Sequence, residues 1–203
     1  LKLSKAKVLV IGVGGLGCPI LQYLVASGVG TIGIADDDVV QLSNLNRQIL
    51  FGPQDVGQYK VDVAKKKLLL LNEAVSIQAW RKRWSTTDCI NYFKEYDIIV
   101  DATDNFASRY LINDACVLLD KPLVFGAVSK YEGQLAVFNC GSEEKTVNYR
   151  DLFPEPPMAN EVLNCAEAGV LGILPGIIGV MQATEVIKLI TGIGHPLVNK
   201  LLT

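Results

Sequence analysis

A glycine-rich turn near the start of the chain has the spacing of a nucleotide-binding loop. Gly12, Gly14 and Gly17 fit the pattern G-x-G-x-x-G, and they follow directly on an apolar run at residues 8–11. Glycine suits such a turn because the backbone bends tightly and must approach a ligand closely. A helix that starts at this turn directs its unpaired N–H groups and its positive dipole end toward the ligand. The whole turn, Gly15 included, is therefore predicted to bind a nucleotide.

An acidic residue lies at the matching place on the next strand. The strand predicted over residues 31–35 runs into Asp36, at the usual distance from the glycines for a carboxylate that binds ribose hydroxyls. Strand, turn, helix and second strand together form a βαβ nucleotide-binding unit. This unit alone leaves open whether the nucleotide is NAD, FAD or ATP.

The polar residues farther along the chain favour ATP with Mg²⁺ over a nicotinamide. Asn44, Arg47 and Lys60 follow the second strand, and Arg47 and Lys60 are expected near the surface. The helix N-terminus largely satisfies the pyrophosphate of a dinucleotide, whereas a triphosphate carries more charge, farther out, for Arg47 and Lys60 to bind. Asp104 comes after a buried strand at residues 97–101. It lies where open α/β sheets bind ligands, and its oxygen atoms suit Mg²⁺.

Hydrophobic periodicity predicts the elements that position these residues. Apolar runs alternate with segments of helical spacing, which predicts an α/β fold: a Rossmann-like, mainly parallel sheet flanked by helices, with a few antiparallel edge strands. Strands are predicted at residues 8–11, 31–35, 75–79, 97–101, 122–127 and, at an antiparallel edge, 133–139; helices are predicted at residues 16–27, 59–72, 87–93, 105–119 and 175–191. Residues 37–51 are predicted to form a loop with a short helical turn over the nucleotide. Residues 140–169 are predicted to form a long proline-rich loop, functional or mobile.

The composition is that of one well-buried domain covering residues 1–203. Hydrophobic residues make up 50% of the chain and charged residues 20%, and the net charge is −2. Nothing therefore indicates a nucleic acid or an anionic membrane as a partner. The five cysteines are odd in number and form no C-x-x-C pair. Together with the absence of a recognisable signal peptide, this predicts a cytoplasmic location.

The longest uncharged stretch, residues 168–184, is predicted to be a buried or subunit-interface helix rather than a membrane span. It is rich in glycine, it is interrupted by Pro175, and it is short for crossing a bilayer. It also continues into Glu185 and Lys188 with helical periodicity.

With these features the chain resembles the MoeB/ThiF/HesA family, the relatives of ubiquitin-activating enzymes. The matching segments are GVGGLG at 12–17, the acid at Asp36, SNLNRQ at 43–48, Lys60 within GQYK, and DATDN at 101–105. The likeness continues through GQLAVF at 133–138 and FPEPP at 153–157, so it covers essentially the whole chain. Five such motifs in the right order are specific, although each one alone is weak.

The resemblance implies a reaction and a role for each matching residue. The reaction is ATP-dependent adenylation of the C-terminal glycine of a small ubiquitin-fold or sulfur-carrier protein ending in Gly-Gly, of the molybdopterin or thiamine biosynthesis type, with release of pyrophosphate. The implied roles are ribose binding by Asp36, phosphate binding by Asn44, Arg47 and Lys60, Mg²⁺ coordination by Asp104, and orientation of that aspartate or of the phosphates by Arg109. Such a transfer depends on positioning and electrostatic stabilisation rather than on a protein nucleophile.

The resemblance also implies a reactive thiol and an assembly. Cys165, in LNCAEAGV, matches the cysteine that some relatives use for thioester or acyl-disulfide chemistry. A packing role for Cys165 remains equally open, because a buried cysteine is an ordinary small hydrophobic residue. The implied assembly is a two-fold homodimer.

The chain departs from the family pattern at the zinc site and at its N-terminus. Many relatives carry two C-x-x-C pairs that bind a structural zinc. The first pair falls on residues 148–151 (NYRD), and the second would lie beyond Thr203. No structural zinc is expected, because a Cys₄ site cannot be assembled. The N-terminal helices of relatives, which can donate an arginine to the partner's active site, would precede Leu1.

Two other functions fit parts of the pattern. An NAD(P)-dependent oxidoreductase uses the same glycine turn, but no obvious acid–base group for hydride transfer accompanies it here. A non-catalytic partner subunit of an activating enzyme would keep the fold for dimerisation.

Asp101 is expected to be structural at the end of its strand. His195 is the only histidine and is not expected to be catalytic. The remaining cysteines are also expected to be structural: Cys18, Cys89, Cys116 and Cys140.

Overall fold

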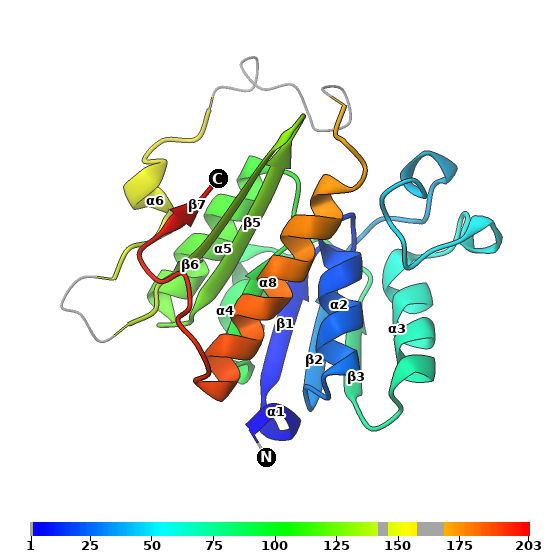
Figure 1. The fold of residues 1–203 in the computed structure, drawn as a ribbon, viewed down its shortest axis with the longest axis horizontal. Helices are drawn as coiled ribbons and strands as arrows, with labels where there is room; N and C mark the ends of the chain where they lie inside the picture. Colours follow the sequence, from blue (N-terminus) through cyan, green and yellow to red (C-terminus); the bar gives the residue numbers. More distant parts are fainter. Residues whose placement is uncertain (1, 142–145, 158–168) are drawn as a thin grey trace.

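A seven-stranded sheet forms the centre of the computed structural model, which describes residues 2–141, 146–157 and 169–203 (Figure 1). The strands are β1 (Lys7–Ile11), β2 (Thr31–Ala35), β3 (Ser76–Trp80), β4 (Ile98–Asp101), β5 (Leu123–Ser129), β6 (Glu132–Phe138) and β7 (Leu201–Leu202). Their order in the sheet is β3-β2-β1-β4-β5-β6-β7.

The first five strands are parallel, and the last two are antiparallel to their neighbours. β1 lies between β2 and β4, with Val10 paired to Ile34 on one side and to Val100 on the other. β6 runs antiparallel to β5, and β7 antiparallel to β6. The central strands read as continuous apolar runs because helices cover both of their faces. The predicted fold class, a mainly parallel sheet with antiparallel edge strands, is confirmed.

Helices cover both faces of the sheet. They are α1 (Lys2–Lys5), α2 (Gly17–Ala26), α3 (Lys60–Leu71), α4 (Thr86–Tyr92), α5 (Phe106–Leu118), α6 (Tyr149–Leu152) and α8 (Leu174–Thr191), with 3₁₀ turns at Leu42–Asn44, Pro53–Asp55 and Phe93–Glu95. In Figure 1, α2, α3 and α8 lie in front of the sheet and α4 and α5 behind it. Each face has its own hydrophobic cluster, the first with residues of α2, α3 and α8 and the second with residues of α4, α5 and α6.

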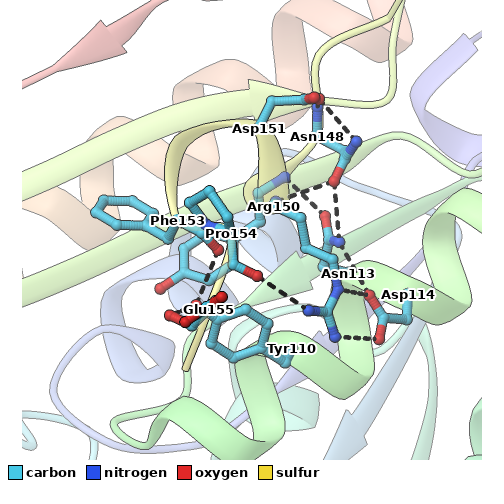
Figure 2. Close-up of polar contacts among 10 residues, drawn as sticks. Tyr110, Asn113, Asp114, Asn148, Arg150, Asp151, Phe153, Pro154 and Glu155 are labelled. Carbon is cyan, nitrogen blue, oxygen red and sulfur yellow. Dashed lines mark hydrogen bonds and ion pairs between the residues drawn. The ribbon is translucent and has the colours of Figure 1, made fainter. Parts of the chain in front are cut away.

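The expected elements are present with small differences at their ends. Among the described helices and strands, α1, α6 and β7 were not expected, and neither were the 3₁₀ turns at Pro53–Asp55 and Phe93–Glu95. The four-residue helix α6 lies in the region expected to be a loop. A capping box starts this helix (Figure 2): Oδ1 of Asn148 accepts a hydrogen bond from the amide of Arg150 at 2.9 Å, and Oδ2 of Asp151 accepts one from the amide of Asn148 at 2.9 Å. A helix that short shows no hydrophobic period, so only its caps could have predicted it.

Helix α8 is long and apolar enough to cross a membrane by length and composition, the one such helix in the described part of the chain. It packs on α2, β5 and β6. Ala183 and Val186 lie in the core, and the buried Gln182 donates its amide N–H to the carbonyl of Asp101 at 2.8 Å. This packing accounts for much of its apolar character and agrees with a buried or interface helix.

Two glycines in α8 provide a matched test of this packing. A Cβ on Gly179 would lie 2.5 Å from the carbonyl oxygen of Leu16 and 2.7 Å from Cγ of Pro19, whereas a Cβ on Gly176 would meet nothing within 4 Å. We expect Gly179→Ala to lower the free energy of unfolding by about 1–3 kcal/mol through overpacking. Gly176→Ala should raise it by about 0.5–1 kcal/mol through helix propensity. Denaturant titration measures both, and equal effects would contradict the close approach of α2 and α8.

Candidate functional site

A pocket opens at the carboxyl edge of the sheet. In Figure 1 this edge lies at the upper end of β1. Most of the predicted site residues line it: Gly12, Gly14, Gly15, Asp36, Arg47, Lys60, Asp104 and Arg109. Gly17 and Asn44 do not. This edge is where open α/β sheets bind ligands.

The glycines of the turn have different tasks. Gly12 has a φ of +98°, and its Cβ would lie 2.5 Å from the carbonyl oxygen of Ala102. A Cβ on Gly17 would clash with the carbonyl oxygen of Gly12. These two glycines therefore let the backbone segments pack. A Cβ on Gly14 would meet only Nε2 of Gln48, at 3.8 Å, so Gly14 is the one of these three that leaves space in the pocket.

Asp36 joins the end of β2 to the glycine turn. Its Oδ2 accepts a hydrogen bond from the amide of Val13 at 2.7 Å, and its Oδ1 accepts one from the amide of Asp38 at 2.8 Å. Burial raises the pKa of Asp36, and the charge of Lys60 together with these hydrogen bonds opposes the rise. The carboxylate thus stabilises the glycine turn and also lines the pocket. Its binding of a ribose stays a prediction.

Lys60 is buried, although the sequence interpretation placed it near the surface. Only 4% of the residue is exposed, and its Nζ lies 2.6 Å from Oδ2 of Asp38. The cause is a β-bridge between Val39 and Tyr59, with the amide of Lys60 donating to the carbonyl of Asp38 at 3.0 Å. This bridge folds the 37–51 segment against the start of α3. The expectation of a surface position for Lys60 was wrong.

Arg47 is half-buried at the pocket and is held by its own loop. Its Nη1 donates to the carbonyl of Ser43 at 3.3 Å and to Oδ1 of Asn46 at 3.2 Å. The carbonyl of Asn44 accepts from the amides of Arg47 and Gln48, at 3.1 and 3.0 Å. Asn44 therefore shapes the turn that presents Arg47, and its side chain does not line the pocket.

The two aspartates of the DATDN segment lie in different environments. Asp101 is buried, and its Oδ1 accepts from the amide and the hydroxyl of Thr103 at 2.9 and 2.7 Å. Burial raises the pKa of Asp101, and the charge of Arg109 opposes the rise. Asp104 is exposed and lines the pocket. These positions agree with a structural role for Asp101 and leave Asp104 accessible to a cation.

Arg109 lines the pocket and contacts the backbone of this turn. It is 7% exposed, and its Nη2 donates to the carbonyl of Thr103 at 3.3 Å. Its guanidinium lies 5.2 Å from the ring centroid of Phe106 and 5.8 Å from that of Phe125. Its contacts in the described part of the chain therefore orient the backbone of the turn.

Sequence reasoning missed several residues that line the pocket. Lys82, Arg83 and Trp84 follow β3, and Gln48 follows Arg47. The sequence did contain a signal for the first three residues. The charged run WRKRW follows a predicted strand, at the same carboxyl edge of the sheet. The carboxylates of Asp36, Asp37 and Asp38 also gather within 4.8 Å of one another.

Cys165 lies outside the described residues, so its predicted role has no structural test. The other cysteines are described. Cys18 and Cys89 are buried, and burial raises the pKa of each to about 12. Cys116 is also buried and Cys140 half-buried. Thiols with raised pKa values are poor nucleophiles, which agrees with the expected structural roles. His195 is exposed and does not line the pocket.

The chain is similar to known proteins along its whole length. The model of the ThiF family matches residues 1–203. The chain is 48% identical to a sulfur carrier protein adenylyltransferase of Thermus thermophilus, over 99% of this chain and 75% of that protein. It is 50% identical to MoeZ, a probable adenylyltransferase/sulfurtransferase of Mycobacterium tuberculosis, over 99% of this chain and 52% of that protein. The crystal structure of E. coli MccB with ATP has a TM-score of 0.82 at 26% identity, over 98% of this chain and 60% of that chain.

Proposed function

Because this chain belongs to the ThiF family, we propose that it uses ATP to adenylate the C-terminal glycine of a small ubiquitin-fold carrier protein ending in Gly-Gly. The family resemblance drawn from the sequence is confirmed by the family match and by adenylyltransferase relatives. The activity of the whole protein remains a proposal, because the chain spans 75% of one of these relatives and about half, 52%, of the other.

The observation that carries the proposal is that an aspartate and two cationic side chains line one pocket. Asp36 lies at the end of β2, and Arg47 and Lys60 reach the pocket from the segment that follows. The pocket also has polar atoms that are buried and have no hydrogen-bond partner among the described residues: Gln48 Oε1, Trp84 Nε1 and Arg109 Nε. Buried polar groups without partners favour a polar ligand at this place.

The reaction needs positioning more than it needs a nucleophile from the enzyme. A carboxylate oxygen of the carrier's terminal glycine attacks the α-phosphorus of ATP, and the bond to pyrophosphate breaks. Negative charge develops on the phosphate oxygens during this step. Arg47 and Lys60 would stabilise that charge with charge-assisted hydrogen bonds. The ion pair with Asp38 holds the ammonium of Lys60 at the pocket before ATP arrives.

Asp104 is the proposed ligand of Mg²⁺. It is exposed at the pocket, and it makes no hydrogen bond or ion pair within the described part of the chain. By contrast, Asp36 already accepts two amide hydrogen bonds, and Asp38 pairs with Lys60. A free carboxylate at the ligand-binding edge fits a hard cation that shares phosphate oxygens. When bound, Mg²⁺ would neutralise part of the phosphate charge.

We propose that the enzyme works in the cytoplasm.

We also propose that two copies of the chain assemble through α8. Ile173 is 65% exposed, Ile177 49% and Val180 36%. Their spacing places these residues on one face of the helix. A contiguous apolar face of this kind marks an interface. In a two-fold dimer, this same face of each subunit would form the interface.

Three further parts of the sequence interpretation stay proposals. Cys165 is the proposed acceptor in a later thiol-dependent step, separate from adenylation. No structural zinc is expected, because Asn148 and Asp151 occupy the positions of the first pair of zinc-binding cysteines. The pathway that the carrier serves is open between the molybdopterin and thiamine types. The relatives do not favour the two alternatives, an oxidoreductase or a non-catalytic subunit.

ATP–pyrophosphate exchange in the presence of the carrier tests the cation pair. We expect Lys60→Met and Arg47→Gln each to lower exchange roughly 10- to 100-fold, the value of a lost charge-assisted hydrogen bond. Methionine keeps the packing of the buried lysine stem, so the unfolding transition should stay cooperative. Lys66→Met, at an exposed position of the same helix, is the control. Normal exchange by both pocket variants, or a larger thermal shift with NAD than with ATP, would refute the proposal.

The Mg²⁺ dependence of exchange tests Asp104. Asp104→Asn keeps the shape of the side chain and removes its charge, so metal-dependent turnover should collapse while nucleotide affinity changes much less. Asp37→Asn is the comparison, because Asp37 belongs to the rival acidic group. A Mg²⁺ response lost in Asp37→Asn and kept in Asp104→Asn would move the site to residues 36–38.

Light scattering at micromolar concentration tests the dimer. The unsubstituted chain should have twice the monomer mass, and Ile177→Glu should dissociate it, because a charge would be buried at the interface. Leu70→Glu, at a position 82% exposed on α3, should leave the mass unchanged. A monomeric unsubstituted chain would contradict the assembly.

A further inference from the structure

Gln48 is a buried glutamine at the pocket whose side-chain oxygen has no hydrogen-bond partner in the described part of the chain. The residue is 4% exposed, and it lines the pocket. Its Oε1 is buried and accepts no hydrogen bond from any described residue. A buried polar atom without a partner costs folding free energy, because its contacts with water are lost and are not replaced. The stability of the fold therefore does not explain why a glutamine is present here.

The backbone around Gln48 is fixed by the core. The amide of Gln48 donates to the carbonyl of Asn44 at 3.0 Å, and the carbonyl of Gln48 accepts from the amide of Phe51 at 3.0 Å. Leu50 and Phe51, which follow, belong to the hydrophobic core of the sheet face that α2, α3 and α8 cover. The turn that carries Gln48 is therefore anchored on both sides of this residue.

The nitrogen end of the Gln48 side chain lies next to the glycine turn. Nε2 of Gln48 would be 3.8 Å from a Cβ on Gly14, and that Cβ would meet no other described atom within 4 Å. A Cβ on the neighbouring Gly15 would instead lie 2.9 Å from Cβ of Pro175 and 3.5 Å from Cγ of Arg47. The space beside Gly14 is therefore open, and an N–H donor borders it.

The position of Asp36 indicates which part of a nucleotide would reach this space. Its Oδ2 accepts a hydrogen bond from the amide of Val13, the residue before Gly14. Under the proposed function this carboxylate binds the ribose, and the α-phosphate is the group bonded directly to that ribose. Helix α2 begins at Gly17, and the positive end of its dipole favours an anion at the same turn. The α-phosphate would therefore lie between the glycine turn and Gln48.

We infer that Gln48 binds the α-phosphate of ATP, with Nε2 donating a hydrogen bond to a non-bridging oxygen beside Gly14. The inference rests on the proposed function, because it takes the ligand of the pocket to be ATP. The α-phosphorus is the atom that the carrier's carboxylate attacks, so the oxygen bound by Gln48 gains negative charge during adenylation, and a donor fixed at that oxygen stabilises the charge. An amide supplies this donor without placing a third cation beside Arg47 and Lys60.

Nucleotides with different numbers of phosphates test this contact. Gln48→Met keeps the length of the side chain and removes the donor. The Kd of ATP and the Kd of AMP, both by titration calorimetry, should rise by the same factor, roughly 10- to 100-fold, the value of a hydrogen bond to a charged group. The Kd of adenosine, which has no phosphate, should stay within about twofold. The kcat/KM of ATP–pyrophosphate exchange should fall by at least the factor found for ATP binding.

Urea unfolding separates a binding role from a packing role. Because Oε1 of Gln48 is buried without a partner, Gln48→Met should leave the unfolding midpoint unchanged or raise it. Gln48→Glu keeps the shape and turns a negative charge toward the phosphate, so it should raise both Kd values more than Gln48→Met does. Gln41→Met, at an exposed position of the same segment that does not line the pocket, should change neither the Kd values nor the midpoint.

The outcomes distinguish this inference from the proposed function. If the unsubstituted chain binds and exchanges ATP while Gln48→Met matches it, only the inference is overturned. The same holds if Gln48→Met weakens the binding of ATP and leaves that of AMP unchanged, because the contact would then be with an outer phosphate. A lower unfolding midpoint with unchanged Kd values would make Gln48 a packing residue and would also overturn it. If the unsubstituted chain neither binds nor exchanges ATP, the proposed function falls and this inference falls with it.

Discussion

The fold depends on the close packing of backbone segments at the carboxyl ends of β1, β2 and β4. The amide of Gly12 donates to the carbonyl of Ala35 at 2.9 Å, and the amide of Ala102 donates to the carbonyl of Ile11 at 2.9 Å. A side chain at Gly12 has no room there, since its Cβ would lie 2.5 Å from the carbonyl oxygen of Ala102. Because these strands end together, the residues that follow each of them line a common pocket.

Much of this arrangement could be predicted because its causes are local or periodic. Buried parallel strands must be apolar along their whole length, and helices on a sheet must be apolar on one side. The glycine spacing and the acid after the second strand add geometric requirements that few other residue types meet. The carboxyl-edge rule then predicts that Asp36 and Asp104 lie at one site, and both line the pocket.

The structural features that were not predicted depend on contacts between segments distant in the sequence, or are very short elements. Lys60 reads as the start of a lysine-rich surface helix, and its burial follows only from the bridge between Val39 and Tyr59. Helix α6 is set by its caps rather than by periodicity. The packing of the Tyr149 ring on Phe125 joins residues 24 positions apart. No pattern within a window of the sequence contains that pairing.

The ion pair between Lys60 and Asp38 gives the pocket an internal counter-ion. The lysine side chain is 5% exposed and the aspartate side chain 65%, so an ammonium that would be costly to bury alone is neutralised by a carboxylate that water also solvates. Under the proposed function, a phosphate that reached Lys60 would therefore exchange one anion for another, and the displaced carboxylate would remain hydrated. The net gain in binding free energy would be the difference between two ion pairs rather than the whole of one. When the product left, the carboxylate would pair with Lys60 again. Such an exchange would suit a site that must release what it binds and begin again.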